Sequence, residues 1–335
     1  MEKQKWYNNI VKVRNIVQII FSLFLLYAGW QFYRFVRYFE TGGKTEFVAR
    51  PEAVDGFLPI SALLALKQLL VAKVFDPIHP AALVIFLTII LISFLFKKGF
   101  CSWLCPVGTI SEWLGTLGEK LFGRTFELPK VVDWLLMIPK YLILGFFVKV
   151  ILIDMPIMSV MGFLQSPYNL IADVKMLHFF LDLSPFAIKV LIFLAVASIL
   201  IKNFWCRYLC PYGALLGVVS LVSPVKVTRN EETCINCGSC TKACPNQIEV
   251  HNQKRISSPE CNACLNCISN CPQEDETLKL SIYNKLKVST MTYPVLLLGV
   301  FLLMITIAKL TGHWESGITK EMYQQFIPKA EYFNH

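Results

Sequence analysis

Five long apolar stretches constrain the fold of this chain more than any other feature of its sequence. They cover residues 15–36, 80–96, 134–153, 186–201 and 292–310. A helix rises about 1.5 Å per residue, so each stretch is close to the length that crosses ~30 Å of hydrocarbon. Only 16% of the residues are charged, against about 25% in soluble domains. The sequence therefore predicts an α-helical integral membrane protein with about five transmembrane helices.

Lysine and arginine residues flank the apolar stretches and do not gather on one basic face. The net charge is +9, but this distribution is typical of residues that orient membrane helices, and it excludes a nucleic-acid-binding protein. Four basic residues precede the first stretch: Lys3, Lys5, Lys12 and Arg14. They predict a cytoplasmic N-terminus, with the polar region 221–288 on the cytoplasmic side of a bacterial inner membrane.

A Cys-x3-Cys-Pro motif occurs twice, each time at the predicted cytoplasmic end of an apolar stretch. The two motifs supply Cys101, Cys105, Cys206 and Cys210. The distance from Pro80 to Cys101 equals the distance from Pro185 to Cys206, at 21 residues. This repetition predicts two repeat units, 56–115 and 162–220, related by a pseudo-two-fold axis along the membrane normal.

Eight further cysteines form two runs of the pattern Cys-x2-Cys-x2-Cys-x3-Cys-Pro. This is the bacterial-type ligand pattern for two 4Fe-4S clusters, in which the fourth cysteine of each run ligates the cluster of the other run. The predicted ligands of the first cluster are Cys234, Cys237, Cys240 and Cys271. Those of the second cluster are Cys261, Cys264, Cys267 and Cys244.

Zinc is the alternative metal for these two runs, because Cys-x2-Cys pairs also bind structural zinc. Zinc sites do not usually pack four cysteines into eleven residues twice over, so two clusters are the favoured interpretation. Clusters that exchange ligands must lie close together, and this closeness suits electron transfer better than substrate chemistry.

The four cysteines of the Cys-x3-Cys-Pro motifs are predicted to converge near the cytoplasmic interface. Cysteines four residues apart share one face of a helix, and the repeat would bring the two pairs together. Each proline is expected to end its helix and free backbone N–H groups toward sulfur. Three interpretations stay open: a third iron–sulfur or metal site, redox-active dithiols, or buried cysteines that act as small hydrophobes.

These predictions combine into a helical membrane protein with an inserted α+β ferredoxin domain. The membrane domain is predicted over 1–225 and the cytoplasmic ferredoxin-like domain, with two 4Fe-4S clusters, over 226–282. A C-terminal transmembrane helix over 289–311 and an extracytoplasmic tail over 312–335 complete the chain.

The segment from Gly99 to Gly108 (GFCSWLCPVG), its repeat around Cys206 and the two ferredoxin runs resemble the NapH/NosR-like membrane polyferredoxins, a group that includes the CcoG copper-handling proteins. The resemblance covers roughly residues 15–285. It implies an iron–sulfur protein that moves electrons between the quinone pool and other redox subunits, as a quinol dehydrogenase or oxidoreductase subunit of an anaerobic or nitrogen-oxide-type respiratory chain.

Two rival functions stay open beside quinone-linked electron transfer. One is an electron-donating assembly factor for a metal centre, such as copper, of a respiratory enzyme. The other is a relay subunit with no reaction of its own inside a larger complex. A quinone-sized pocket would favour quinone-linked electron transfer. Metal ligation by thiols or thioethers would favour the assembly factor. A stable partner with its own active site would favour the relay subunit.

Three histidines, His79, His178 and His313, are predicted at the outer membrane edge, near Asp76 and Asp182. Oxidation of a quinol releases two protons, which an imidazole or a carboxylate can accept. No common spacing ties the three histidines together, so the favoured interpretation is that they only tolerate the headgroup zone.

Overall fold

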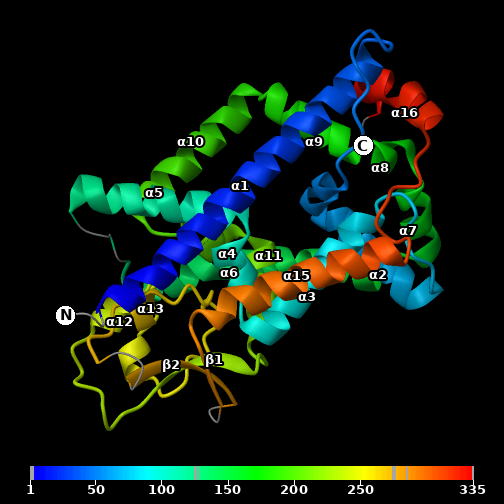
Figure 1. The fold of residues 1–335 in the computed structure, drawn as a ribbon. Helices are drawn as coiled ribbons and strands as arrows, with labels where there is room; N and C mark the ends of the chain where they lie inside the picture. The colour runs from blue at the N-terminus through cyan, green and yellow to red at the C-terminus, as the bar shows by residue number, and fades with distance from the viewer. Residues whose placement is uncertain (1–3, 124–125, 127, 274–276, 284–285, 334–335) are drawn as a thin grey trace. The chain divides into compact units, whose positions relative to one another are not determined.

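The computed structural model describes residues 4–123, 126, 128–273, 277–283 and 286–333, which form a mostly helical protein (Figure 1). Residues 274–276 of the predicted ferredoxin domain and 334–335 of the predicted tail lie outside the described residues. The chain divides into two compact units. The first comprises Met1–Ser22, Ile89–Leu144 and Lys189–Phe301, and the second Leu23–Thr88, Gly145–Ile188 and Leu302–His335. All twelve cysteines fall in the first, here called the cysteine unit, and the second is called the cysteine-free unit.

Several helices are long and apolar enough to cross a membrane. Among the described residues these are Ile10–Glu40 within α1 (Gln4–Glu40), Lys130–Asp154, formed by α6 (Lys130–Phe147) and η2 (Val148–Asp154), and α15 (Thr292–Leu310). The bent pair α9 (Ala172–Leu181) and α10 (Pro185–Leu200) qualifies as a fourth span if it is counted as one. Helix α3 (Pro80–Phe96) is apolar but has 17 residues. The chain is thus a membrane protein, while the number of five spans stays a prediction.

The cysteine unit contains a small antiparallel sheet with short helices beside it (Figure 1). The strands are β1 (Val225–Arg229), β2 (Leu278–Ile282) and β3 (Leu286–Val288), in the order β1-β2-β3. Val225 pairs with Ile282 and Leu280 with Val288. The remaining short elements are α12 (Ser239–Lys242), η4 (Val250–Asn252) and α13 (Asn266–Ser269). This α+β module carries the two ferredoxin runs.

Four short elements of the cysteine unit carry or follow the Cys-x3-Cys-Pro motifs. They are α4 (Gly99–Trp103), α5 (Pro106–Phe122), η3 (Trp205–Leu209) and α11 (Pro211–Ser220). Two side chains of α4 bind the ferredoxin loop directly: Trp103 Nε1 donates to the Ala263 carbonyl at 3.1 Å, and Ser102 Oγ to the Asn262 carbonyl at 2.6 Å. The ferredoxin module and the first motif therefore form one packed body.

The cysteine-free unit is built around an aromatic core. Its further elements are η1 (Glu52–Phe57), α2 (Pro59–Ala72), α7 (Ile157–Leu164), α8 (Pro167–Leu170), α16 (Lys320–Phe326) and η5 (Ile327–Tyr332). The ring of Phe35 lies 5.1 Å from Phe39 and 5.0 Å from Tyr323, centroid to centroid. Tyr323 and Ile327 are buried in this core, so the predicted tail contains helices that help to hold the unit together.

Candidate iron–sulfur centres

The ferredoxin module brings its eight cysteines together in two groups of four. One cavity is lined by Cys234, Cys237, Cys240 and Cys271. A second cavity is lined by Cys244, Cys261, Cys264 and Cys267. These groups have the same members as the two predicted ligand sets, including the exchange of Cys244 and Cys271 between the runs. The assignment of individual ligands stays a prediction that this arrangement supports.

Both runs share an unusual backbone conformation. Gly238 and Leu265, at matching positions of the two runs, have positive φ angles of 72° and 64° and precede α12 and α13. Asn236 and Ala263 also match, with φ angles of 54° and 50°. A positive φ is disfavoured for residues with a side chain, and such residues concentrate at functional sites. The turns direct successive cysteines toward a common centre.

The donor chemistry of the two cavities fits iron–sulfur clusters. Burial raises the pKa of the Cys264 thiol to about 11, so a thiolate at this position needs a cation such as ligated iron beside it. Among the described residues, no three His, Cys, Asp or Glu side chains are arranged to hold a single metal ion. Two groups of four thiols at the spacing of the bacterial ligand pattern fit two 4Fe-4S clusters.

The two ferredoxin centres are also neighbours of each other. Cys267, of the second group, lies within electrostatic range of Cys240, of the first. Each cavity is therefore close enough to the other for their thiols to interact. Bound there, each cluster would supply one-electron chemistry, and the surrounding chain would fix the distance between them.

The two Cys-x3-Cys-Pro motifs have the same local structure. Pro106 and Pro211 occupy the first turn of α5 and α11, and Cys105 and Cys210 are the N-cap residues that precede them. The backbone N–H of Gly213 donates to Cys210 Sγ at 3.2 Å. Free N–H groups and the positive end of the dipole at a helix N-terminus favour a negatively charged sulfur. The expectation that each proline ends its helix and frees N–H groups toward sulfur agrees with this structure, since α4 and η3 both end before the proline.

The expectation that each cysteine pair lies on one α-helix is wrong. Helix α4 ends at Trp103, before Cys105, and Cys206 lies in the π-helical η3. The N–H of Cys105 bonds the Phe100 carbonyl at 3.0 Å, and the N–H of Cys210 bonds the Trp205 carbonyl at 2.9 Å. Both are i to i−5 bonds, a wide turn that recurs at functional sites. The proline after each pair cannot continue the ordinary helix, and the wider turn results.

The four cysteines of these motifs lie together. Cys206 is within electrostatic range of Cys101, Cys105 and Cys210, and Cys101 is in range of Cys105 and Cys210. Gly108 permits this approach, because a Cβ at that position would lie 2.1 Å from the Cys101 carbonyl oxygen. Four thiols gathered in this way, two of them at helix N-termini, disfavour the interpretation as inert small hydrophobes. A third iron–sulfur site and redox-active dithiols both stay open.

Buried ions surround this four-cysteine site. Lys140 Nζ lies 2.6 Å from Glu260 Oε1 and Lys98 Nζ lies 3.6 Å from Glu260 Oε2. Burial alone would raise the pKa of the Glu260 carboxyl, but the two ammonium groups lower it below its usual value. The carboxylate is therefore ionised at neutral pH. The sequence analysis missed these residues, although the positions of Lys98, three residues before Cys101, and Glu260, directly before Cys261, were available signals.

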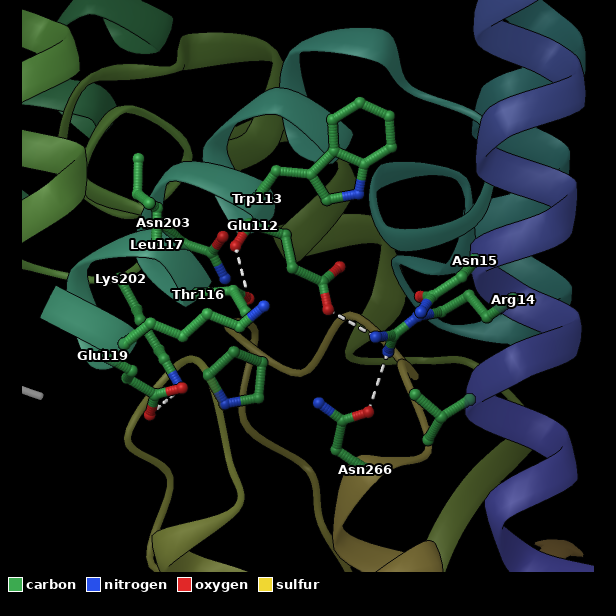
Figure 2. Close-up of a pocket in the computed structure, with 13 residues that line it drawn as sticks. Arg14, Asn15, Glu112, Trp113, Thr116, Leu117, Glu119, Lys202, Asn203 and Asn266 are labelled. Carbon is green, nitrogen blue, oxygen red and sulfur yellow. Dashed lines mark hydrogen bonds and ion pairs between the residues drawn. The ribbon is translucent and has the colours of Figure 1, made fainter. Parts of the chain in front are cut away.

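A pocket of about 450 Å³ lies between α1, α5 and the ferredoxin loops of the same unit. Figure 2 shows Arg14 reaching from α1 between Glu112 and Asn266. Arg14 also donates to the Cys264 carbonyl at 2.7 Å. Asn266 precedes Cys267 and the lining residue Pro245 follows Cys244, so the pocket wall adjoins two loops that carry cysteines of the second group.

The three histidines at the predicted outer edge do not form one site. His79 Nδ1 lies 3.1 Å from Asp55 Oδ1, and its Nε2 lies 2.7 Å from the Asn169 carbonyl oxygen. His178 Nε2 lies 2.8 Å from Glu40 Oε1, and the ring of His313 packs against Phe75. Each histidine thus has its own partners, and the three do not share a site. The expectation that they only tolerate the headgroup zone is wrong for His79, which is buried in an ion pair with Asp55.

Comparison with known proteins gives the same assignment as the cysteines. The family described as "4Fe-4S binding domain" matches residues 78–125 and 183–230, and that described as "4Fe-4S dicluster domain" matches residues 226–272. The membrane helices and the cysteine groups define a membrane-bound iron–sulfur protein of electron transport. More narrowly, the chain belongs to the NapH/NosR-like membrane ferredoxin family.

Three relatives illustrate the range of this family. The chain is 42% identical to YccM of Escherichia coli K12, a protein named for electron transport, over 98% of this chain and 93% of YccM. It is 21% identical to the ferredoxin-type protein NapH of the same organism, over 54% of this chain and 62% of NapH. It is 28% identical to the regulatory protein NosR of Stutzerimonas stutzeri, over 56% of this chain and 25% of NosR. No solved structure matches the chain.

Proposed function

We propose that this protein carries electrons between the quinone pool and redox partner subunits of an anaerobic or nitrogen-oxide-type respiratory chain. One observation carries the proposal: all twelve cysteines collect into three groups of four within one compact unit. Two groups would hold the two ferredoxin clusters. The third is the four-cysteine site of the membrane-edge cysteines Cys101, Cys105, Cys206 and Cys210. Each 4Fe-4S cluster exchanges one electron at a time.

The order of the centres follows from their contacts. Helix α4 contains Cys101 and is bonded through Ser102 and Trp103 to the loop that carries Cys261 and Cys264. An electron at the four-cysteine site therefore has the second ferredoxin cluster as its packed neighbour. The first cluster follows through the neighbouring thiols of Cys240 and Cys267. Its ligand Cys237 is exposed, which suits electron exchange with a partner.

The pocket in Figure 2 is the proposed quinone site. Its volume of about 450 Å³ falls in the range of small-molecule sites, about 300–1,000 Å³. Helix α5 lines it and exposes one apolar face: Val107, Ile110, Trp113, Leu117 and Leu121. Such a helix suits the membrane interface, where a lipid-soluble quinone arrives. Trp113 offers a ring for stacking, and Lys120 and Asn203 offer donors for carbonyl oxygens.

The proposed orientation completes this function. We place the ferredoxin module on the cytoplasmic side of the inner membrane, with five spans and two repeat units of 56–115 and 162–220. Two observations support the repeat. The two Cys-x3-Cys-Pro motifs have the same local structure, and one family matches the chain twice, at residues 78–125 and 183–230. The predicted domain limits, 1–225, 226–282, 289–311 and 312–335, belong to the same proposal.

The proposal is tested by reduction of the full-length protein in lipid nanodiscs with a quinol analogue under anaerobic conditions. Bleaching of the iron–sulfur absorbance reports electron entry. Trp113→Ala should slow this reduction about tenfold, the loss expected for one stacking contact, and leave reduction by dithionite unchanged. Trp134→Ala, which removes an exposed tryptophan outside the pocket, is the matched control.

If dithionite reduces the clusters but no quinol analogue reduces them, the link to the quinone pool is wrong. If the quinol analogue reduces Trp113→Ala and Trp134→Ala at equal rates, quinol still supplies the electrons, but this pocket is not the quinol site. A protein that accepts electrons only when a partner subunit is added would instead favour the relay function.

A further inference from the structure

Two buried lysines share a single carboxylate beside the four-cysteine site. The side chains of Lys98, Lys140 and Glu260 are 4%, 0% and 8% exposed. Removing a charged group from water is costly, so buried ions occur where opposite charge compensates them. Glu260 compensates only one of the two ammonium groups. The cluster therefore has a surplus of positive charge.

Arg207 adds a third buried cation. Its Nη2 lies 2.6 Å from Asp133 Oδ2, which satisfies one part of the guanidinium. Its Nε and Nη1 have no hydrogen-bond partner among the described residues, and its side chain is 4% exposed. Buried donors without a partner are rare in proteins and call for an explanation. With Lys98 and Lys140, three cations face two carboxylates in this part of the unit.

The cysteines of the four-cysteine site lie close to the surplus positive charge. One small cavity is lined by Cys101 and Cys206, by the cations Lys98 and Arg207, and by the carboxylates of Glu260 and Glu112. Glu112 is paired with Arg14, so it does not compensate the other cations. Lys98 is also within electrostatic range of Cys210, and Lys140 is within range of the same cysteine. A centre held by four thiolates carries net negative charge and gains one more on taking up an electron. The surplus cations and the thiolate centre are therefore complementary.

We propose that Lys98, Lys140 and Arg207 set the reduction potential of the four-cysteine centre by compensating its negative charge, and that Glu260 moderates their effect. The inference rests on the proposed function, in which these cysteines hold a cluster. The potential of an iron–sulfur centre depends on the charge around it and on hydrogen bonds to its sulfurs. A nearby cation stabilises the reduced form more than the oxidised form, which raises the potential. A nearby carboxylate lowers it.

The sign of the shift separates this role from a structural one. Lys98→Met removes a positive charge at similar length and should lower the potential of the four-cysteine centre. Glu260→Gln removes a negative charge and should raise it. Lys98→Arg keeps the charge and should restore the original potential. A purely structural role would not predict that Lys98→Met and Glu260→Gln shift the reduction potential in opposite directions.

The test is an anaerobic redox titration of the full-length protein, followed by electron paramagnetic resonance. The signal of the four-cysteine centre is identified as the one missing from Cys101→Ser. At a fixed ambient potential, Lys98→Met should lower the ratio of reduced to oxidised centre about tenfold, which is about 59 mV for a one-electron couple. Lys140→Met should act in the same direction. The signals of the two ferredoxin clusters should shift less.

The outcomes are distinguishable. A wild-type protein without a third signal would reject the cluster at the four cysteines, and this inference with it. A third signal whose potential stays unchanged in Lys98→Met and Glu260→Gln would reject this inference alone. If Lys98→Met loses the centre altogether, the opposite shifts expected for Lys140→Met and Glu260→Gln decide the question, and shifts of the same sign contradict charge compensation.

Discussion

The two compact units use buried charge in opposite ways. Beside the four-cysteine site of the cysteine unit, Lys98, Lys140 and Arg207 share the carboxylates of Glu260 and Asp133. Two donors of Arg207 have no hydrogen-bond partner among the described residues. In the cysteine-free unit the balance is reversed, because Arg50 pairs with three carboxylates: Glu52, Asp55 and Asp173. Asp55 gains a second cation from His79, whose pKa is raised.

This difference separates ions that stabilise the fold from ions that serve a cofactor. Arg50 has carboxylate partners within its own unit and connects η1 to α9, so its positive charge is compensated without a ligand. The surplus positive charge beside the four-cysteine site would be compensated by the anionic centre that we propose there. The cysteine unit contains every cysteine of the chain.

Replacement of a ferredoxin cysteine should have the largest effect. Cys261→Ala should abolish one cluster, with the loss of about four iron atoms per chain, and leave the other cluster detectable by electron paramagnetic resonance. Cys244→Ala should remove the signal that Cys261→Ala removes, because both cysteines line one cavity. If Cys244→Ala removed the signal lost in Cys234→Ala, the exchange of ligands between the runs would be wrong.

Replacement of the membrane-edge cysteines should leave both ferredoxin clusters intact. Cys101→Ser and Cys206→Ser should each abolish the same third centre, since each pair alone supplies too few ligands for a four-thiolate site. Quinol-driven reduction of the ferredoxin clusters should fall with it. If both variants keep their full iron content and full electron transfer, these cysteines act only as small hydrophobic residues.

Replacement of Arg50 should destabilise the protein without changing its iron–sulfur signals. Arg50→Met leaves buried carboxylates unpaired, and loss of one partner of a buried ion pair costs about 3–5 kcal/mol. Thermal unfolding in detergent measures the loss. Arg34→Met is the matched control, because the ion pair of Arg34 with Glu46 is exposed and worth about 0–1 kcal/mol. A shift of the cluster potentials in folded Arg50→Met would contradict the separation of the two roles.

The smallest effect is a dependence of stability on alkaline pH. Burial opposes the charge of His79, but the Asp55 carboxylate outweighs it and raises the pKa of His79 from 6.5 to about 9. A raised pKa means that the stabilising contribution is complete below pH 6.5 and disappears as the pH rises through about 9. His79→Gln should remove this part of the pH dependence. The same loss of stability in wild type and His79→Gln would assign it to other groups.

The grouping of the ferredoxin cysteines could be predicted from the sequence because ligand spacing is local. Each ferredoxin run fixes the approximate positions of its own thiols, and the exchange of the fourth ligand follows from the known pattern. The convergence of Cys101 and Cys105 with Cys206 and Cys210 could be predicted from the repeat. The wide i to i−5 turns could not, since they arise from competition between the helix and the following proline.

The buried ions could not be predicted from spacing. Lys98 resembled an ordinary cytoplasmic flank of a membrane helix, and Lys140 lies within an apolar stretch without a partner nearby in sequence. Their partner, Glu260, is more than a hundred residues away. The helices of the C-terminal tail could not be predicted for a similar reason, because Tyr323 and Ile327 pack in one core with residues distant in the sequence, such as Phe35 and Val174.

The central claim is that all twelve cysteines are ligands of iron–sulfur centres in three groups of four. Metal analysis of the anaerobically purified full-length protein, with Mössbauer spectroscopy of the bound iron, tests it most directly. We expect about twelve iron atoms per chain, all in four-iron clusters. About eight would limit the clusters to the ferredoxin module and contradict the third group. About four, or zinc in place of iron, would contradict the assignment of the ferredoxin cysteines as well.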